Sequence, residues 1–501
     1  MATEVYVSAI ADRNRDDFAQ VTADASGRLL DFRTSRNSHM ASTSVAPAQV
    51  QPRLKRSLKL WHVVVIGIVM IQPIAPMGIY GGISNKAGGH VVTAILVAMV
   101  AMLFTAISYG RMARAYPSAG SAYTYVGQEI HPALGYVTGW SMVMDYVLNP
   151  LICTVLCSKL MQNWLPGAPY WVLAIFFAAL FTALNLRGIK SSARINEVMA
   201  AAMTLVVVVF LYYVVKHIAG LGMYPDGYFT RPFYNAETFD LAGLKVGTSL
   251  AVLTYIGFDG VSTMSEEVEN PRRNILIATV LVCVVTGVLS SIEVYAAQLV
   301  WGSKPFSPVT VDTAFPHIAG IIGGQRLFDL LNGTILVANI GSGMAAQLAA
   351  ARLLYGMGRS DAIPRGFFGA VEGKRCIPRN NVLLVGAAAL MGALALEYFG
   401  RMVGDTAYQL GAQMLNFGAF IAFMGVNAAA FMRYFVRGRR SVGNLLPPVL
   451  GFLICGYIWF GLSTPAKIVG AIWVALGVLY GAVKTRGFRS ELVRFDMPAE
   501  G

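Results

Sequence analysis

Long apolar stretches recur along the chain from residue 61 to residue 484, and only short polar segments separate them. Most of these stretches are roughly 18–25 residues long, which is the length that an α-helix needs to cross the hydrocarbon core of a bilayer. We therefore expect an all-α polytopic membrane protein with about twelve transmembrane helices. The predicted spans are residues 61–82, 91–110, 134–158, 170–187, 195–216, 243–264, 275–300, 327–353, 380–398, 405–432, 445–463 and 466–484.

The first and sixth predicted spans are interrupted near their centres. The first contains Pro73 and Pro76, and the sixth contains the stretch YIGFDG at residues 255–260, which includes Gly257 and Asp259. Proline removes a helical hydrogen bond, and glycine loosens the backbone. Because unpaired backbone groups are costly in lipid, such breaks persist at membrane depth only inside protein or beside a polar cavity.

These two interruptions divide the chain into two halves, each of which begins with a broken helix. Broken helices in corresponding positions of two repeats indicate a transporter binding site between them. The alternative is that proline and glycine only kink packed helices. The predicted parts are a disordered cytoplasmic N-terminal tail at residues 1–52, a first five-helix repeat at 53–242, a second at 243–432, and two peripheral helices with a cytoplasmic C-terminus at 433–501.

The N-terminal tail is polar, has mixed charge, and contains no apolar run long enough for a signal peptide. This composition predicts disorder. Met40 begins a plausible shorter chain whose basic segment directly precedes the first span, so we expect residues 1–39 either to be dispensable or to arise from an upstream start choice. Sequencing the N-terminus of the natural protein would test this expectation.

Three acidic residues lie inside the predicted spans and well away from their ends. Asp259 is in the interruption of the sixth span, Asp145 is in the middle of the third, and Glu293 is in the seventh. An ionisable side chain at this depth is costly and normally faces a partner, a cavity or a pathway. Ser141, Asp145 and Asn149 follow at i, i+4 and i+8, so they line one stripe of a helix. Hydrogen bonding between helices is the alternative role for this stripe.

Composition and charge support a membrane protein rather than a nucleic-acid-binding one. The chain is 56% hydrophobic and 13% charged, with a net charge of +13, whereas soluble domains are about 25% charged. Most Lys and Arg residues from Arg53 onward fall on one side of the predicted membrane. This positive-inside pattern places both termini in the cytoplasm and fits a multi-pass protein of the cell (inner) membrane. The surplus charge therefore orients the protein and indicates no nucleic-acid partner.

Sequence motifs for enzymes and nucleotide-driven pumps do not occur. The chain has no G-x-x-x-x-G-K-[ST] loop, so we expect secondary transport and not ATP hydrolysis. It has neither H-E-x-x-H nor G-x-S-x-G, so we expect no enzyme activity, no cofactor and no metal. Cys153 and Cys157 form an i,i+4 pair, which we interpret as apolar packing.

Several ordered motifs resemble the amino acid–polyamine–organocation (APC) superfamily of permeases. GFDGVSTMSEEVENPRRNI at residues 257–275 resembles its sixth-span signature, and AISYGRMARAYPSAGSAYTYV at 106–126 resembles the segment after its second span. LRGIKSSARINEVM and ARLLYGMGRSDAIPR match later segments, so the resemblance covers roughly residues 55–490. Within the superfamily, the stretch from Gly89 to Val126 together with NFGAFIAFMGVN most resembles the bacterial putrescine importers.

The resemblance implies a fold of five plus five helices in an inverted repeat, with helices 1 and 6 broken and two further peripheral helices. It also implies a substrate site between the broken helices, where Asp259 matches a carboxylate that polyamine-handling relatives use. The candidate substrate-binding residues are Asp259, Asp145, Phe258, Tyr255, Gly257, Gly260, Pro76, Met77, Gly78 and Asn149. The candidates for ion coupling or gating are Glu266, Glu267, Ser342 and Glu293.

The first interruption departs from the family pattern. Amino-acid-carrying relatives usually have a glycine-rich G-S-G there, whose free amides receive the substrate carboxylate, whereas this chain has QPIAPMG with two prolines. Two inward acids and a weakened carboxylate cradle favour a diamine such as putrescine. Coupling to protons is favoured over coupling to sodium. The alternatives are an amino acid permease or exchanger and, more remotely, a nutrient sensor without transport.

Overall fold

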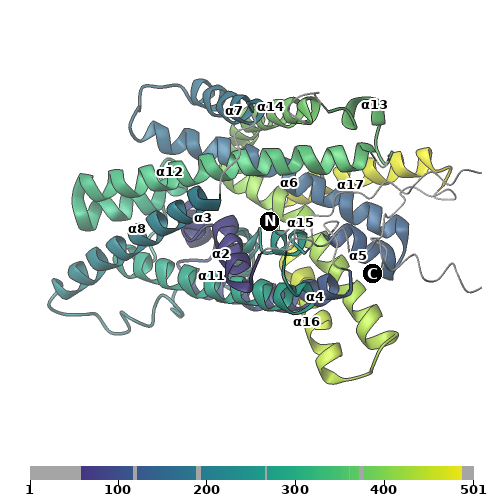
Figure 1. Ribbon diagram of the computed structural model, residues 1–501. Helices are drawn as coiled ribbons and strands as arrows, with labels where there is room; N and C mark the ends of the chain where they lie inside the picture. The colour runs from purple at the N-terminus through teal and green to yellow at the C-terminus, as the bar shows by residue number, and fades with distance from the viewer. Residues whose placement is uncertain are drawn as a thin grey trace, which may run out of the picture. The chain divides into compact units, whose positions relative to one another are not determined.

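The described part of the chain consists of helices joined by short connections. A computed structural model describes residues 58–116, 121–187, 193–265, 268–359, 361–371 and 377–487, all of which lie in one unit, Leu54–Gly501. The first half contains α2 (Leu60–Ile71), α3 (Ala75–Lys86), α4 (Val91–Ala115), α5 (Ser121–Glu129), α6 (Pro132–Gln162), α7 (Tyr170–Leu186) and α8 (Ala193–Ala219) (Figure 1).

The second half repeats this helical character after a connection at residues 220–240. Its elements are α9 (Leu241–Ala251), η1 (Val252–Tyr255), α10 (Gly260–Thr263), α11 (Pro271–Trp301), η2 (Val311–Thr313), α12 (Ala314–Arg359), α13 (Arg365–Phe368), α14 (Arg379–Val403), α15 (Ala407–Phe431) and η3 (Met432–Val436). Two further helices, α16 (Val442–Trp459) and α17 (Thr464–Lys484), complete the described chain.

The predicted all-α membrane architecture is confirmed. Within the described ranges, 10 helical segments are long and apolar enough to cross a membrane. The other two predicted spans coincide with shorter apolar helices, α7 and the α2–α3 pair. The total of twelve crossings and the inverted relation between the two halves stay predictions.

One predicted boundary differs clearly from the structure. The eighth span was expected at 327–353, but α12 begins at Ala314, because a short helical segment precedes the long one. The two segments meet at Gly324, whose φ of 67° and ψ of −167° are not helical. Glycine adopts this conformation without the steric cost that a side chain would add, so the apolar pattern alone did not reveal the join.

The predicted interruption of the first span is confirmed as a break between α2 and α3. Gln72 has a φ of 72°, and the backbone becomes helical again at Ala75, with Pro76 in the first turn of α3. Proline is tolerated there because the first N–H groups of a helix have no helical partner. The Gln72 side chain donates a hydrogen bond of 3.0 Å to the Ala338 carbonyl of α12, which anchors the break.

The predicted interruption of the sixth span is also confirmed. The α9–η1 segment ends at Tyr255, Gly257 has a φ of 118°, and α10 begins at Gly260. A positive φ of this size favours glycine strongly over other residues, so Gly257 accounts for the position of the break. An isolated parallel bridge between Leu58 and Val268 joins the backbone just before α2 to the backbone after α10.

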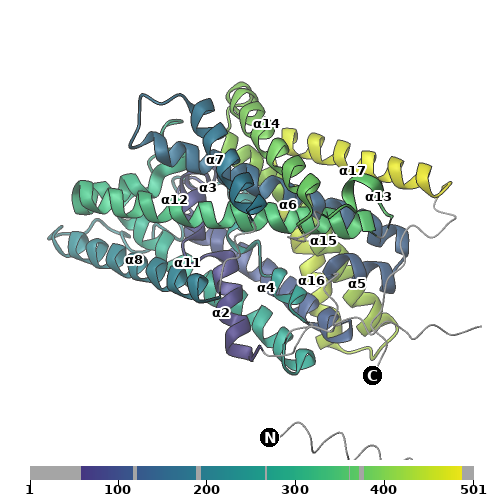
Figure 2. The same cartoon turned by 45° about the horizontal axis from the view of Figure 1, so that its top comes forward.

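Helices that lie far apart in sequence pack side by side. The α6 helix packs against α12 and α15, and α11 packs against α4 and α2 (Figure 1). Figure 2 shows α17 lying along α6 and α15. Trp140 of α6 and Trp473 of α17 stack with centroids 4.9 Å apart, and each indole N–H donates to the other residue's carbonyl, at 2.8 and 3.0 Å. This reciprocal pair fixes α17 to α6.

Candidate functional site

The second helix break presents an acid at the start of α10. Asp259 is only 5% exposed, and its carboxylate lies beside the backbone amides of Gly257 and Gly260. The Ser262 hydroxyl donates a hydrogen bond of 2.6 Å to the Asp259 carbonyl, which holds the first turn of α10. The non-helical backbone of the second break therefore also positions the Asp259 carboxylate.

The structure brings Asp145 and Asp259 together. Asp145 projects from the middle of α6, is 7% exposed, and interacts electrostatically with Asp259. Among the described residues, the ion pairs involve neither of these acids. Two buried carboxylates that share a site without a cation repel each other. The arrangement therefore favours a ligand that supplies positive charge.

Aromatic side chains from three helices surround the two acids. Tyr109 of α4 and Tyr146 of α6 each interact electrostatically with both carboxyl groups. Phe258 packs edge-to-face on Tyr109 with centroids 5.5 Å apart, and its centroid is 5.3 Å from that of Phe423 of α15. The Tyr109 hydroxyl is buried and has no hydrogen-bond partner within the described part of the chain. This hydroxyl and the ring faces are suitable contacts for an ammonium group.

Sequence reasoning predicted Phe258 but missed Tyr109, Tyr146 and Phe423. Tyr109 lies in the motif AISYGRMARAYP, and Tyr146 directly follows Asp145. Nearly every span carries aromatic residues, so their presence alone does not show which of them face the acids. The one usable signal was proximity in sequence to a motif or to an intramembrane acid.

The remaining substrate-site candidates lie in three other places. Pro76, Met77 and Gly78 are buried in the first turn of α3. A side chain at Gly78 would come within 2.9 Å of Leu156 and 3.1 Å of the Tyr408 hydroxyl, so α3 approaches α6 and α15 closely there.

Tyr255 lies on the other side of the second break, where its hydroxyl donates a hydrogen bond of 2.9 Å to the Ile95 carbonyl of α4. The Tyr255 hydroxyl therefore joins η1 to α4.

Asn149 and Ser342 belong to a polar patch between α6 and α12. The Cys153 thiol donates to the Asn149 side chain at 3.5 Å, and the Ser342 side chain also hydrogen-bonds to Cys153. Cys153 and its neighbour Cys157 are buried free thiols. Glu266 and Glu267 lie outside the described residues. Glu293 is buried on α11, and neither of its carboxylate oxygens has a hydrogen-bond partner among the described residues.

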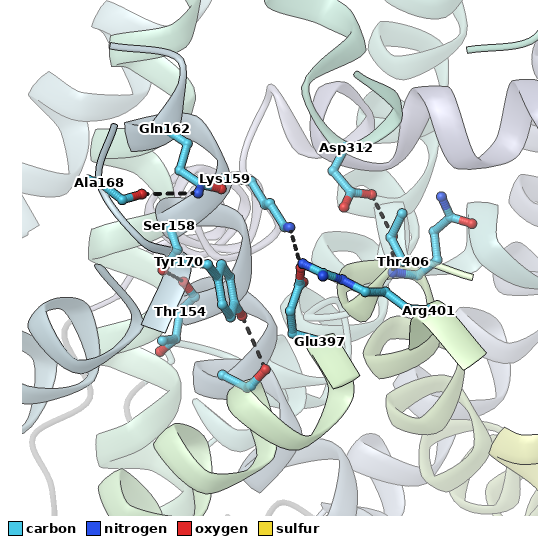
Figure 3. Close-up of polar contacts among 12 residues, drawn as sticks. Thr154, Ser158, Lys159, Gln162, Ala168, Tyr170, Asp312, Glu397, Arg401 and Thr406 are labelled. Carbon is cyan, nitrogen blue, oxygen red and sulfur yellow. Dashed lines mark hydrogen bonds and ion pairs between the residues drawn. The ribbon is translucent and has the colours of Figure 1, made fainter. Parts of the chain in front are cut away.

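Two ion-pair networks join helix ends. In the first, Lys159 of α6 and Arg401 of α14 both contact the Glu397 carboxylate, at 2.9 and 2.7 Å (Figure 3). Beside it, Asp312 of η2 accepts a hydrogen bond of 2.7 Å from the Thr406 hydroxyl. The predicted orientation places this network at the outer ends of the helices.

The second network has the buried Glu129 of α5 at its centre. Arg433 of η3 contacts the Glu129 carboxylate at 2.5 Å. Arg437, which directly follows η3, contacts the same carboxylate at 2.8 Å. The Tyr116 hydroxyl also donates to this carboxylate at 2.7 Å, and burial raises the pKa of Tyr116 to about 12. This network ties the end of α4 and α5 to the end of α15.

Comparison with known proteins places this arrangement among membrane permeases. The sequence model of the family described as amino acid permease matches residues 62–490. The low-affinity putrescine importer PlaP of Escherichia coli K12 is 34% identical, over 91% of this chain and 99% of its own length. The branched-chain amino acid permease BcaP of Lactococcus lactis is 25% identical, over 78% of this chain and 86% of its own. The vacuolar cationic amino acid transporter 4 of Arabidopsis thaliana is 25% identical, over 77% of this chain and 64% of its own length.

Proposed function

Because the chain belongs to the amino acid permease family, a family of multi-pass membrane transporters, we propose that it takes up putrescine or a related diamine across the cell membrane. Transport would be secondary, driven by a cation gradient, with protons favoured over sodium. The site would be exposed to each side of the membrane in turn. Both termini would face the cytoplasm.

The observation that carries the proposal is the pairing of Asp145 with Asp259. The two buried acids interact with each other, and no described cation forms an ion pair with either one. A diamine has two ammonium groups and can neutralise both carboxylates at once. In this arrangement each acid binds one end of the substrate, and the Tyr109 hydroxyl accepts a hydrogen bond from an ammonium group.

The geometry of the first break supports a substrate without a carboxylate. The Ala75 amide donates to the Gln72 carbonyl at 3.1 Å, and the Met77 amide donates to the Ile74 carbonyl at 3.0 Å. Pro76, between them, has no N–H group. The start of α3 therefore offers few free amides to a carboxylate, which a zwitterionic amino acid would require.

An amino acid permease or exchanger is the second candidate function. Two of the relatives named above are transporters of branched-chain or cationic amino acids. A cationic amino acid would satisfy one of the two acids through its side chain and the other through its α-amino group. It would leave its carboxylate to the amides at the start of α3. Competition between substrates therefore separates the two candidates.

Uptake of labelled putrescine into proteoliposomes tests the proposal. Asp145→Asn and Asp259→Asn each remove one charge, and each should lower uptake at least about tenfold, since a hydrogen bond to a charged group contributes about 1.5–3 kcal/mol. Asp226→Asn, on the exposed connection after α8, is the matched control and should transport normally. Undiminished uptake by both site variants would refute the diamine site. Transport of amino acids but not of putrescine would support the second candidate.

A further inference from the structure

Glu293 is the most completely isolated acid among the described residues of the membrane helices. It lies on α11, its side chain is 0% exposed, and neither carboxylate oxygen has a hydrogen-bond partner. It also takes part in no ion pair within the described ranges. By contrast, the buried Glu129 is paired with two arginines.

Within the described residues, no ion pair compensates for this burial. The α11 helix packs against α2, α3, α4, α8, α10, α12 and η1, and no described ion pair or hydrogen bond joins a titratable side chain on them to the Glu293 carboxylate. Several such groups are bound elsewhere. Tyr80 of α3 donates to Gln298, Tyr255 of η1 donates to the Ile95 carbonyl, and Lys86 of α3 pairs with Asp405.

An ionised carboxylate cannot stay in such surroundings. Moving a bare carboxylate from water into a dry interior is very costly, and buried acids without partners take up a proton instead. In the conformation described here, the Glu293 side chain is therefore a neutral carboxylic acid.

Hydroxyl groups extend from Glu293 along the same face of α11. Thr286, Ser290 and Glu293 follow at i, i+4 and i+7, so their side chains share one stripe. The hydroxyls of Thr286 and Ser290 are buried and have no hydrogen-bond partner among the described residues. The same holds for the hydroxyl of Thr254 on η1, a segment that packs against α11. Each orphaned polar group disfavours this conformation. A second conformation that lets water reach the stripe would satisfy all of these groups together.

We propose that Glu293 is the proton-binding site that couples transport to a proton gradient. The side chain holds its proton while the α11 stripe is closed. When alternating access hydrates the stripe, the O–H bond breaks, the proton passes to water, and the electron pair stays on the carboxylate. This inference rests on the proposed transport function. It assigns the proton to a site separate from the two acids that bind the diamine.

The test uses purified full-length protein in proteoliposomes and the variant Glu293→Gln, which imitates the protonated acid permanently. Two readouts separate coupling from transport. Counterflow exchange of labelled putrescine without a gradient should stay within about twofold of the unaltered protein. Accumulation driven by an imposed pH gradient should be lost, and the uptake rate should no longer vary with pH. Glu237→Gln, an exposed acid before α9, is the matched control and should keep both activities.

A second variant protects the test against a folding defect. Glu293→Asp keeps a titratable acid and should keep accumulation driven by the pH gradient. Normal accumulation by Glu293→Gln would overturn the assignment, as would loss of counterflow in both variants. Accumulation driven by sodium and not by protons in the unaltered protein would also overturn it. Absence of putrescine counterflow in the unaltered protein would instead contradict the proposed function.

Discussion

Tyr109 and Tyr136 share the same local chemistry at the residue scale but have different surroundings. Both hydroxyls are buried and lack hydrogen-bond partners, but only Tyr109 interacts with Asp145 and Asp259. Tyr136 lies in a separate cluster with Val143, Leu354 and neighbouring side chains. The two tyrosines therefore form a matched pair in which only the relation to the acids differs.

Substitution of these tyrosines separates binding from packing. Tyr109→Phe should raise the KM for putrescine about tenfold or more, because it removes a hydrogen bond to a charged group, which contributes about 1.5–3 kcal/mol. Tyr136→Phe should leave the KM unchanged. Initial rates of uptake across a range of putrescine concentrations measure both. Equal changes in KM for the two variants would show that the Tyr109 hydroxyl makes no special contribution.

Sequence reasoning found the acids more readily than it found their aromatic neighbours. Asp145 and Asp259 are conspicuous because ionisable residues are rare inside apolar spans. Tyr109 and Phe423 are ordinary residues of such spans, and only the packing of α4 and α15 around the second break brings them to the acids. The periodicity of apolar residues shows which face of a helix is buried. It does not show which other helix packs against that face.

At the scale of helices, glycine determines how closely α3 can approach its neighbours. A Cβ atom at Gly81 would lie 2.1 Å from the Val311 carbonyl oxygen of η2, which is backbone and cannot easily move. Gly356 of α12 provides a matched position, since a Cβ atom there would meet nothing within 4 Å. Both residues are helical, so the two positions differ mainly in the space around them.

Alanine at these positions should have opposite effects on stability. Gly81→Ala should lower the free energy of unfolding by about 1–3 kcal/mol through overpacking. Gly356→Ala should leave it unchanged or raise it by about 0.5–1 kcal/mol, because alanine favours helix over glycine. Thermal unfolding of the purified variants in detergent compares them. A stable Gly81→Ala protein would mean that η2 moves freely away from α3.

A second element-scale contact joins the end of α3 to the start of α15. The Lys86 ammonium lies 2.6 Å from the Asp405 carboxylate, which is only 6% exposed. Lys86→Ala should destabilise the protein by about 1–3 kcal/mol, because it leaves a largely buried carboxylate unpaired, although partial exposure of Lys86 moderates the loss. The exchanged pair Lys86→Asp with Asp405→Lys should restore part of the lost thermal stability. If the double variant is no more stable than the summed effects of Lys86→Asp and Asp405→Lys predict, the ion pair does not account for the lost stability.

The helix breaks were predicted, whereas the join inside α12 was missed. Proline and glycine clusters mark a break inside an otherwise apolar run, and both predicted breaks occur in the structure. Gly324 directly follows Gly323, and Gly320 lies shortly before them, so a glycine cluster does mark this join. The predicted eighth span began at residue 327, after this cluster, and so did not include the short helical segment before it.

At the scale of the whole molecule, the distribution of basic residues predicts the orientation in the membrane. Cysteine labelling from outside the cell can test it, because Cys153, Cys157, Cys283 and Cys455 are buried. The fifth cysteine, Cys376, would be replaced by serine. Lys304→Cys, in the exposed connection after α11, should react with a membrane-impermeant maleimide, and Arg439→Cys, before α16, should react only after permeabilisation. The opposite labelling pattern would reverse the predicted topology.

The Trp140–Trp473 pair has a consequence for biosynthesis. Its two residues are separated by 333 positions, so at usual elongation rates the ribosome makes Trp473 on the order of tens of seconds after Trp140. During that interval the Trp140 indole N–H and carbonyl lack the partners that they have in the finished protein. Insertion of the last described helix therefore completes a surface on the third predicted span. A nascent chain that stops before α17 leaves this surface open to lipid and to quality control.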